Sequence, residues 1–303
     1  MAYGLLNVFK PSGPTSHDIV AAVRRGTGER RVGHAGTLDP LADGVLILAL
    51  GKATRLIEYL AAARKEYHAE ITLGLTTDTY DIQGEILSTD EQARPTPDTL
   101  EDALGAFRGT IWQKPPVYSA IKVDGKPAHR RARAGETVEL AAREITIDAL
   151  EVISYDYPLL EIEVACSAGT YIRSLAHNLG QALGCGATLS RLRRTASGDF
   201  RVNDAVRWNE LTRAFDDHSW GRYLLPPDQG AASLPALTLD ADSLSDVLHG
   251  RAIHASGPPG GLCRAYSPDG ELIAILTAGP GDGVWHPHKV LADPAGPDPL
   301  TPS

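Results

Sequence analysis

The chain has 303 residues, enough for one large domain or a main domain with a small companion, because single cores rarely grow past roughly 250 to 300 residues. Hydrophobic residues make up 43 % and charged residues 22 %, as in soluble globular proteins, and no run approaches the roughly 18 apolar residues of a membrane span. The net charge of −9 argues against a nucleic-acid partner only if that charge is evenly distributed.

The first elements bracket a glycine-rich loop. Residues 4–10 form an apolar run closed by prolines and a glycine, which predicts a strand. Ser16 then caps a predicted helix that ends at Gly26 or Gly28. Residues 31–44 have little apolar periodicity and lead directly into an apolar strand over 44–50. This pattern indicates a rigid loop attached to the core.

The middle of the chain mixes strands and helices. We predict a helix over 53–64, a strand over 67–75 and a helix over 96–109 that begins near Thr96 or Asp98. Residues 144–156 and 159–169 alternate like neighbouring antiparallel strands, and a helix over 171–184 follows. The order predicts an α+β domain around a mixed, mostly antiparallel sheet.

Composition changes near residues 222–232, where paired prolines and small residues indicate a boundary. We therefore expect a main domain over about 1–230 and a small β-rich module over 231–293, with a Pro-Asp-Gly hairpin turn. The proline-rich residues 294–303 predict a disordered tail.

The charge is unevenly spread along the chain. Between positions 108 and 133 a single acidic residue, Asp124, stands among basic residues, whereas the part after position 200 is acidic. The basic residues of this segment are Arg108, Lys114, Lys122, Lys126, Arg130, Arg131 and Arg133. A second basic cluster is Arg191, Arg193 and Arg194. These segments remain candidates for contact with nucleic-acid phosphates.

Other features bear on location and metal content. The three cysteines are widely spaced and form no CxxC pair, so neither a disulfide framework nor a zinc site is indicated. Lys10 follows the first apolar stretch rather than preceding it, which is unlike a secretory signal, and we expect a cytoplasmic protein.

The most informative segment is the loop over 33–44, in which Asp39 precedes Pro40. A carboxylate held beside a proline in a rigid loop suits a catalytic role, although composition alone favours a simple Asp-Pro turn. Leu41 and Leu50 occupy positions that an EF-hand needs for calcium, and residues 46–55 lack the first glycine and the hydroxyl of a phosphate-binding loop. Neither a G-x-S-x-G elbow nor a G-x-G-x-x-G fingerprint occurs.

Six ordered segments resemble the TruB family of tRNA pseudouridine synthases. They are KPSGPTSHD (10–18), GHAGTLDPLADGVL (33–46), KEYHAEITLGLTTDTYDIQG (65–84), QKPPVYSAIKVDGK (113–126), CSAGTYIRSL (166–175) and GATLSRLRRTASGDF (186–200). The resemblance implies the pseudouridine synthase fold and isomerisation of uridine 55 in the T loop of tRNA, with the uridine flipped into a pocket. The isomerisation is redox-neutral, so no cofactor or metal is expected.

The resemblance also implies roles for individual residues. Asp39 matches the family's nucleophile, Arg173 matches the arginine that pairs with it, and Tyr67 matches the tyrosine that stacks on the flipped base. A phenol near its ordinary pKa is a poor base at neutral pH, so we favour stacking for Tyr67 over proton removal. Without the resemblance, Tyr67 is best interpreted as a core aromatic and Arg173 as a surface arginine.

Further residues are expected to bind the substrate. Tyr171 and Leu192 match pocket residues, and His34 matches a histidine that helps extract the nucleotide. The segment over about 113–143 resembles the family's mobile insertion, which closes over the T stem-loop, and residues 231–293 resemble PUA-type RNA-binding domains. With the insertion and the first motif, the remaining substrate-binding candidates are Lys10, Tyr118, Lys122, Lys126, Arg130 and Arg131.

Two other hypotheses stay open. An RNA-folding chaperone would use the same surface without turnover, and Asp39→Asn would preserve refolding while abolishing isomerisation. A nucleoside or glycoside hydrolase would use paired carboxylates, such as Asp39 with Asp43, and release free uracil. We expect a monomer that binds tRNA and neither membrane nor metal.

Overall fold

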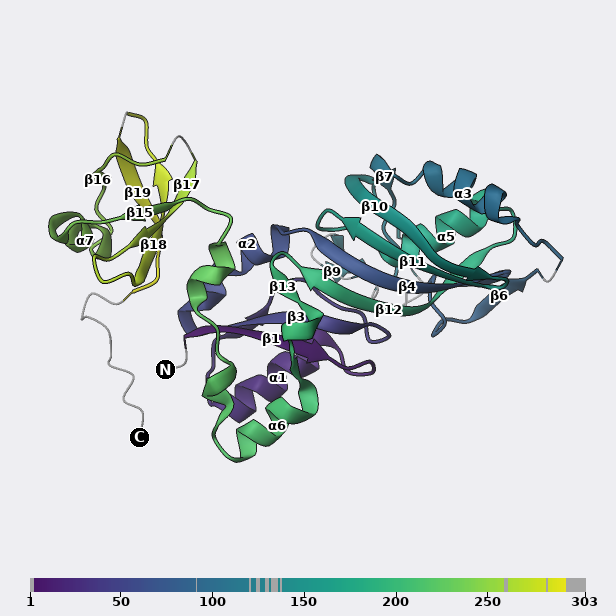
Figure 1. Cartoon of the computed structure of the whole chain (residues 1–303), viewed down its shortest axis with the longest axis horizontal. Coiled ribbons are helices and arrows are strands. Elements are labelled where there is room, and N and C mark those ends of the chain that lie inside the picture. Colours follow the sequence, from purple (N-terminus) through teal and green to yellow (C-terminus); the bar gives the residue numbers. More distant parts are fainter. Residues whose placement is uncertain are drawn as a thin grey trace.

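The computed structural model describes residues 3–90, 92–119, 121–123, 126–128, 131, 136, 138–258, 261–281 and 283–292, with the backbone alone for 122, 123, 126 and 127. The part of the chain so described contains one large sheet, helices against it, and a separate small sheet near the C-terminus. Figure 1 shows the small sheet at one end of the molecule and the helices α3 and α5 at the other.

The large sheet has ten strands within the described ranges. Its order is β14-β1-β3-β12-β4-β11-β10-β7, with β13 paired to β12 and β2 paired to β3. The strands are β1 (Gly4–Lys10), β2 (Val32–His34), β3 (Asp43–Leu50), β4 (Lys65–Leu73), β7 (Gly109–Gln113), β10 (Arg143–Asp156), β11 (Leu159–Cys166), β12 (Ala187–Ser197), β13 (Phe200–Arg201) and β14 (Val206–Arg207). The pairs β1/β14 and β3/β12 are parallel and the others are antiparallel, which confirms the mixed, mostly antiparallel sheet.

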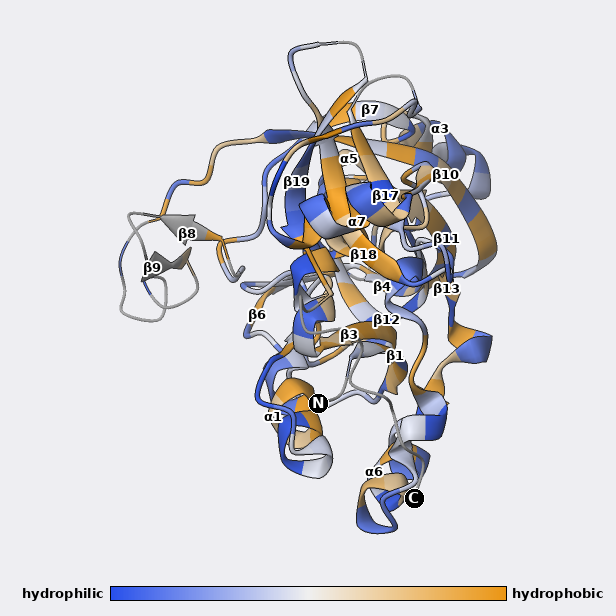
Figure 2. Cartoon of the chain, turned by 90° about the vertical axis from the view of Figure 1, so that its left-hand side faces the viewer, coloured by the Kyte–Doolittle hydropathy of each residue, from blue (hydrophilic) through white to orange (hydrophobic). Residues whose placement is uncertain are grey.

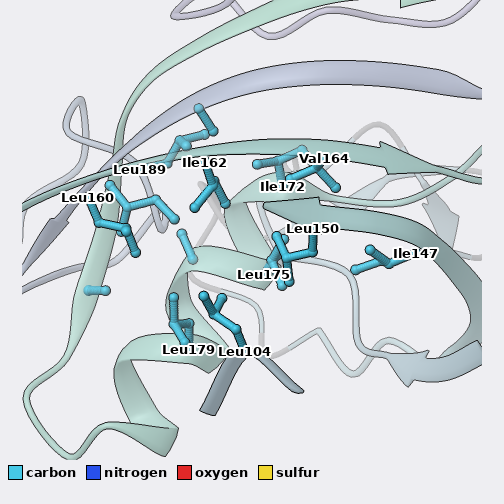
Figure 3. Packing of buried hydrophobic residues seen from close by; sticks show 14 of the residues in the cluster. Leu104, Ile147, Leu150, Leu160, Ile162, Val164, Ile172, Leu175, Leu179 and Leu189 are labelled. Atoms are coloured by element: carbon cyan, nitrogen blue, oxygen red, sulfur yellow. The ribbon is translucent and has the colours of Figure 1, made fainter. Parts of the chain in front are cut away.

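Helices pack against this sheet in two groups. The first group is α1 (Ser16–Thr27) and α6 (Trp208–Asp216), and the second is α3 (Pro97–Gly105) and α5 (Ile172–Ala182). Leu175 and Leu179 of α5 and Leu104 of α3 pack on Ile162 and other buried side chains of the strands (Figure 3). Each group of helices shares a cluster of buried side chains with the sheet. Tyr67 on β4 and Leu192 on β12, in the middle of the sheet, pack against both clusters and therefore lie where the two clusters meet.

The smaller elements complete the described chain. Short strand pairs are β5 (Leu75–Thr77) with β6 (Ile86–Thr89) and β8 (Lys122–Val123) with β9 (Lys126–Pro127). The remaining helix of the main body is α2 (Ile57–Ala62), and the 3₁₀ turns are η1 (Gly51–Leu56), η2 (Val202–Asp204), η3 (Trp220–Tyr223) and η4 (Pro227–Ala231).

The C-terminal module is a five-stranded sheet in the order β15-β17-β18-β19-β16, with one helix. Its elements are β15 (Ala236–Thr238), α7 (Ala241–Leu248), β16 (Ile253–His254), β17 (Leu262–Tyr266), β18 (Leu272–Ala278) and β19 (Val284–Val290). Hydrophobic residues run along β18, whereas α7 mixes both kinds (Figure 2). Ile273, Ala274 and Leu276 pack in the module's core, and Leu272 and Ile275 pack in a cluster that includes Leu56. The Pro-Asp-Gly hairpin prediction agrees with the tight turn between β17 and β18, where Gly270 donates to the carbonyl of Ser267.

Local details differ from the sequence-based expectations. Thr15, not Ser16, caps α1, because its hydroxyl accepts from the Asp18 amide while the Asp18 carboxylate accepts from the Thr15 amide. The helix expected over 53–64 divides into η1 and the short α2. Strand β12 was not predicted, because alternating arginines in its sequence resemble a basic surface segment.

Candidate functional site

Asp39 lies in the loop between β2 and β3. Buried polar side chains fix the backbone of this loop through hydrogen bonds. Ser16 Oγ accepts from the Leu38 amide at 2.9 Å and donates to the Leu38 carbonyl at 3.0 Å. Lys10, whose side chain is fully buried, donates to the carbonyls of Ala42 at 2.7 Å and Pro11 at 2.9 Å. Bonds to the backbone on both sides of Asp39 fix the direction in which its carboxylate points.

The end of the loop approaches β12 very closely. Gly44 has φ 102°, and a Cβ there would lie 2.3 Å from the Arg194 carbonyl oxygen. Glycine is therefore required for both conformation and space. Arg194 is almost completely buried, and its guanidinium donates to the carbonyls of Val45 and Gly36 at 2.7 and 3.1 Å. The sequence analysis missed this role, because Arg194 was grouped with its neighbours as a basic cluster.

Asp39 forms an ion pair with Arg173. Its Oδ2 lies 2.9 Å from Arg173 Nε, although the N–H is not aligned for a hydrogen bond. The Asp39 side chain is 36 % exposed and that of Arg173 is 6 % exposed, so the carboxylate has an open side and the guanidinium does not. The ion pair therefore holds one carboxylate oxygen and leaves the open side of Asp39 accessible to a ligand.

Arg173 is itself surrounded by oxygen atoms. It donates to the carbonyl of Thr79 at 3.1 Å and to that of Tyr118 at 2.9 Å. Its Nη1 also lies 3.4 Å from Oδ2 of the buried Asp81. A planar guanidinium in contact with three separate segments has little freedom to rotate. Asp81 was quoted within a motif but was not predicted as a site residue; its burial close to Arg173 is a tertiary feature.

A pocket of about 240 Å³ adjoins this ion pair, somewhat below the ~300 to 1,000 Å³ of typical ligand pockets, which suits one small planar group. The structure brings together Asp39, Arg173, Tyr67, Tyr171 and Leu192 at its lining, as the predicted site requires. Burial raises the pKa of Tyr67, which makes proton removal by its phenolate at neutral pH still less favourable than for a free phenol.

Tyr171 is held at the start of α5 by Gln113. The Gln113 amide donates to the Tyr171 carbonyl at 3.0 Å and accepts from the Tyr171 amide at 2.8 Å. Gln113 is 1 % exposed, so this double contact is shielded from water. The guanidinium of Arg143 lies over the Tyr171 ring, 4.9 Å from its centroid. Gln113 thus joins the beginning of the predicted insertion to the helix that carries Arg173.

Lys65 also lies at the pocket and was missed. Its ammonium donates to the carbonyls of Leu60, Ala61 and Ala63 at the C-terminal end of α2 and so satisfies them. Burial, together with nearby Arg194, lowers the pKa of Lys65 to about 8. Burial likewise lowers the pKa of Lys10 to about 8, although Asp39 acts in the opposite direction. Lys10 thus holds the loop of Asp39, whereas Lys65 connects the pocket to the end of α2.

His34 lies outside the residues that line the pocket, next to His17 at the start of α1. The two rings meet edge to face with centroids 5.3 Å apart. Burial, and then the neighbouring His17, lowers the pKa of His34 to about 4. The imidazole is therefore neutral at physiological pH.

The remaining candidates belong to the insertion. Tyr118 contributes its carbonyl to Arg173, and Arg131 pairs with Glu136 at 2.6 Å. Lys122 and Lys126 have described backbones in β8 and β9, and Arg130 lies outside the described residues.

The second basic cluster divides between two faces of β12. Arg191 pairs with Glu70 at 2.9 Å, and Arg193 binds both carboxylate oxygens of Asp43 at 2.7 and 2.9 Å. Arg194 points the other way, into the site. The hydrolase hypothesis needs Asp43 as a second catalytic carboxylate. Both oxygens of that carboxylate are already bound by Arg193.

Within the described ranges, no three or more His, Cys, Asp or Glu side chains are grouped closely enough to hold a metal ion. Helices in the same ranges are all too short or too polar to cross a membrane.

Comparison with known proteins covers nearly the whole chain. Residues 24–172 match the sequence model of the TruB family pseudouridylate synthase N-terminal domain. Residues 173–230 and 234–292 match those of the tRNA pseudouridylate synthase B C-terminal domain and of the tRNA pseudouridine synthase II C-terminal region.

Relatives of similar length support the same assignment. The chain is 42 % identical to tRNA pseudouridine synthase B of Dehalococcoides mccartyi, over 95 % of this chain and 96 % of the relative. It is 45 % identical to the protein of that name from Thermobifida fusca, over 91 % and 94 %.

Solved structures confirm the fold. The chain matches a chain in a Cbf5-Nop10-Gar1 complex with a TM-score of 0.75 and 28 % identity, over 97 % of this chain and 86 % of the other. It also matches a chain of an H/ACA RNP bound to a substrate RNA containing 2'-deoxyuridine, with a TM-score of 0.74 and 27 % identity, over 96 % and 86 %. The motifs, the fold and these matches agree, and the chain belongs to the TruB family of pseudouridylate synthases.

Proposed function

We propose that this enzyme isomerises uridine 55 in the T loop of tRNA to pseudouridine, with Asp39 as the nucleophile. The observation that carries the proposal is the half-open Asp39 carboxylate, paired with the buried Arg173 at the edge of a pocket that suits one base. The relatives named tRNA pseudouridine synthase B support tRNA as the substrate.

The chemistry uses groups that the pocket offers. The C1′–N1 bond of the flipped uridine breaks and a C1′–C5 bond forms, while C5 loses a proton and N1 gains one. Atoms and electrons balance without a redox partner, so neither cofactor nor metal is required. Asp39 attacks uracil C6 or ribose C1′, and on either route Arg173 orients the carboxylate.

The neighbouring residues have supporting roles in this proposal. Tyr67 stacks on the uracil, because its raised pKa disfavours base catalysis. Leu192 forms the apolar wall and Tyr171 borders the base. His34, outside the pocket, contacts the RNA as a neutral imidazole, and Lys10 holds the loop of Asp39.

The RNA body is proposed to lie against the insertion over about 113–143. Tyr118, Lys122, Lys126, Arg130 and Arg131 are its candidate contacts, and phosphate contacts of this kind weaken as salt rises. We divide the chain into a catalytic domain over 1–230 and a PUA-like domain over 231–293; the tail over 294–303 lies outside the described residues.

The test is an assay on unmodified tRNA transcript without added metal or nucleotide, with pseudouridine mapped at single-nucleotide resolution. We expect conversion confined to the T-loop uridine for the wild type and none for Asp39→Asn. Conversion at other positions would reject the site assignment, and full activity of Asp39→Asn would reject the nucleophile.

An RNA-folding chaperone activity is a second proposal. The basic candidate contacts of the insertion, Lys122, Lys126, Arg130 and Arg131, are separate from Asp39, so removing the Asp39 charge is expected to leave RNA binding intact. We expect Asp39→Asn to accelerate refolding of a misfolded tRNA as the wild type does. Loss of refolding together with isomerisation would reject this second activity.

A further inference from the structure

The turn that contacts Arg173 contains a strained residue. Tyr80 has φ 65°, in the left-handed region that residues other than glycine rarely adopt. Its two neighbours are the groups that face Arg173, because Thr79 offers its carbonyl at 3.1 Å and Asp81 its carboxylate at 3.4 Å. The conformation of Tyr80 therefore determines whether both oxygens point at one guanidinium. Strain of this kind persists when surrounding contacts over-determine it.

Tyr80 receives such a contact from the same helix that carries Arg173. Its ring stacks on the imidazole of His177, with centroids 3.8 Å apart and planes within 12° of parallel. Arg173 and His177 are four residues apart on α5, so they lie on one helix face, one turn from each other. The helix thus holds the turn at two points. Burial lowers the pKa of His177, which keeps the stacked ring neutral.

We propose that the Tyr80–His177 stack is a positioning device for catalysis, which orients the Thr79 carbonyl and Asp81 so that Arg173 stays aligned with Asp39. This inference rests on the proposed role of Asp39 as nucleophile. His177 touches no reacting atom; it acts through Tyr80, Asp81 and Arg173. Its effect belongs to the chemical step and not to RNA binding.

Other contacts keep the turn folded when the stack is removed. The Leu189 amide donates to the Tyr80 carbonyl at 3.1 Å, and the Ile82 amide donates to the Leu189 carbonyl at 2.9 Å. Thr77 donates its hydroxyl to the Asp81 carbonyl at 2.8 Å. The two bonds to Leu189 anchor the backbone of the turn to β12, and the Thr77 bond ties it to the end of β5. Loss of the stack is therefore expected to loosen the alignment of Arg173 without unfolding the turn.

The experiment compares His177→Ala with His177→Phe, which keeps a flat ring, and with Asn178→Ala, a matched control at the next, partly buried position of α5. Single-turnover conversion of tRNA at saturating enzyme and RNA affinity are measured for each. We expect His177→Ala to slow conversion about 10- to 100-fold, because small misplacements of catalytic groups are costly. Affinity should stay unchanged, and His177→Phe should recover most of the rate.

A double-mutant cycle with Asp81→Asn tests the route of the effect. Because both residues act through Arg173, His177→Ala should slow the Asp81→Asn enzyme far less than it slows the wild type. Full additivity, a wild-type rate for His177→Ala, a loss confined to RNA affinity, or equal losses in the alanine and phenylalanine variants would each overturn the inference. Absence of conversion by the wild type would instead reject the proposed function, so the two failures are distinguishable.

Discussion

Arg173 shows how a single side chain can join segments that are distant in sequence. Its guanidinium contacts Asp39 after β2, the turn at Thr79 and Asp81, and the Tyr118 carbonyl. A planar group with five donors can satisfy these directions together, whereas an ammonium is a point charge. The identity of the cation therefore matters as well as its charge.

We predict that Arg173→Lys lowers the single-turnover rate on the order of 100-fold, because the orientation of Asp39 is lost while the charge remains. The exposed Arg213→Lys on α6 is the control and should react at the wild-type rate. The single-turnover rates of the two variants and the wild type are measured on the same tRNA. A lysine variant within threefold of wild type, on the order of 0.7 kcal/mol, would show that charge alone suffices.

His34 provides a pH-dependent prediction. Its folded pKa is about 4 and its ordinary value is 6.5, so between these values the unfolded chain binds a proton that the folded chain does not. The free energy of unfolding therefore rises with pH from 4 to 6.5, by at most about 3 kcal/mol from this residue. Urea titrations across this range should show a flatter dependence for His34→Gln than for the wild type. Parallel curves would contradict the buried, neutral imidazole.

At the scale of elements, the start of the insertion and the start of α5 form one unit. Gln113, the last residue of β7, binds both the backbone amide and the backbone carbonyl of Tyr171. Ser174 donates its hydroxyl to the Lys114 carbonyl at 2.9 Å. Arg173 lies between these contacts and reaches Tyr118. The start of the insertion is therefore connected to the Asp39–Arg173 ion pair.

We predict that Gln113→Leu costs about 1 to 3 kcal/mol of unfolding free energy, because the Tyr171 amide loses its partner and the Tyr171 carbonyl keeps only the Leu175 amide. Gln113→Glu keeps the acceptor but buries a charge and turns a carboxylate oxygen toward the Tyr171 carbonyl, so its cost should be at least as large. Urea unfolding of the two variants beside the wild type measures these costs. If the Gln113→Leu variant were as stable as the wild type, water would have to bind the Tyr171 amide, and the hydrogen bonds from Gln113 would contribute no stability.

At the scale of the whole molecule, the C-terminal module is docked on α2 and the turns beside it (Figure 1). Leu291 and Leu272 of the module join Leu56 in a shared apolar cluster. Polar contacts surround this cluster: Lys289 pairs with Glu58 and donates to the Arg55 carbonyl. No described residue of the module lines the pocket. Its influence on the chemistry is therefore expected to be indirect.

We predict that Leu291→Ala lowers the unfolding free energy by about 2 to 5 kcal/mol, the usual cost of emptying a buried leucine site. The single-turnover rate of the folded enzyme should be unchanged. Glu58→Gln, which breaks a surface ion pair, should cost at most about 1 kcal/mol. A rate defect in Leu291→Ala without a loss of stability would indicate that the module positions the RNA.

The sequence by itself determined the family, the α+β class and the residues at the centre of the pocket. The resemblance of ordered motifs to the TruB family identified Asp39, Tyr67, Arg173, Tyr171 and Leu192. The residues by themselves favoured a simple turn for Asp39, a core aromatic for Tyr67 and a surface arginine for Arg173. Strand β1 matches its predicted limits, since periodicity and turn residues act locally.

The tertiary structure alone decided which polar residues support the site. Arg191 and Arg194 look alike in the sequence, but a register against β4 turns one outward to Glu70 and buries the other. Asp81, Gln113 and the Tyr80–His177 stack act through partners about 60 to 100 residues away. Their roles depend on long-range pairing of strands and helices, and no local pattern of residues encodes such contacts.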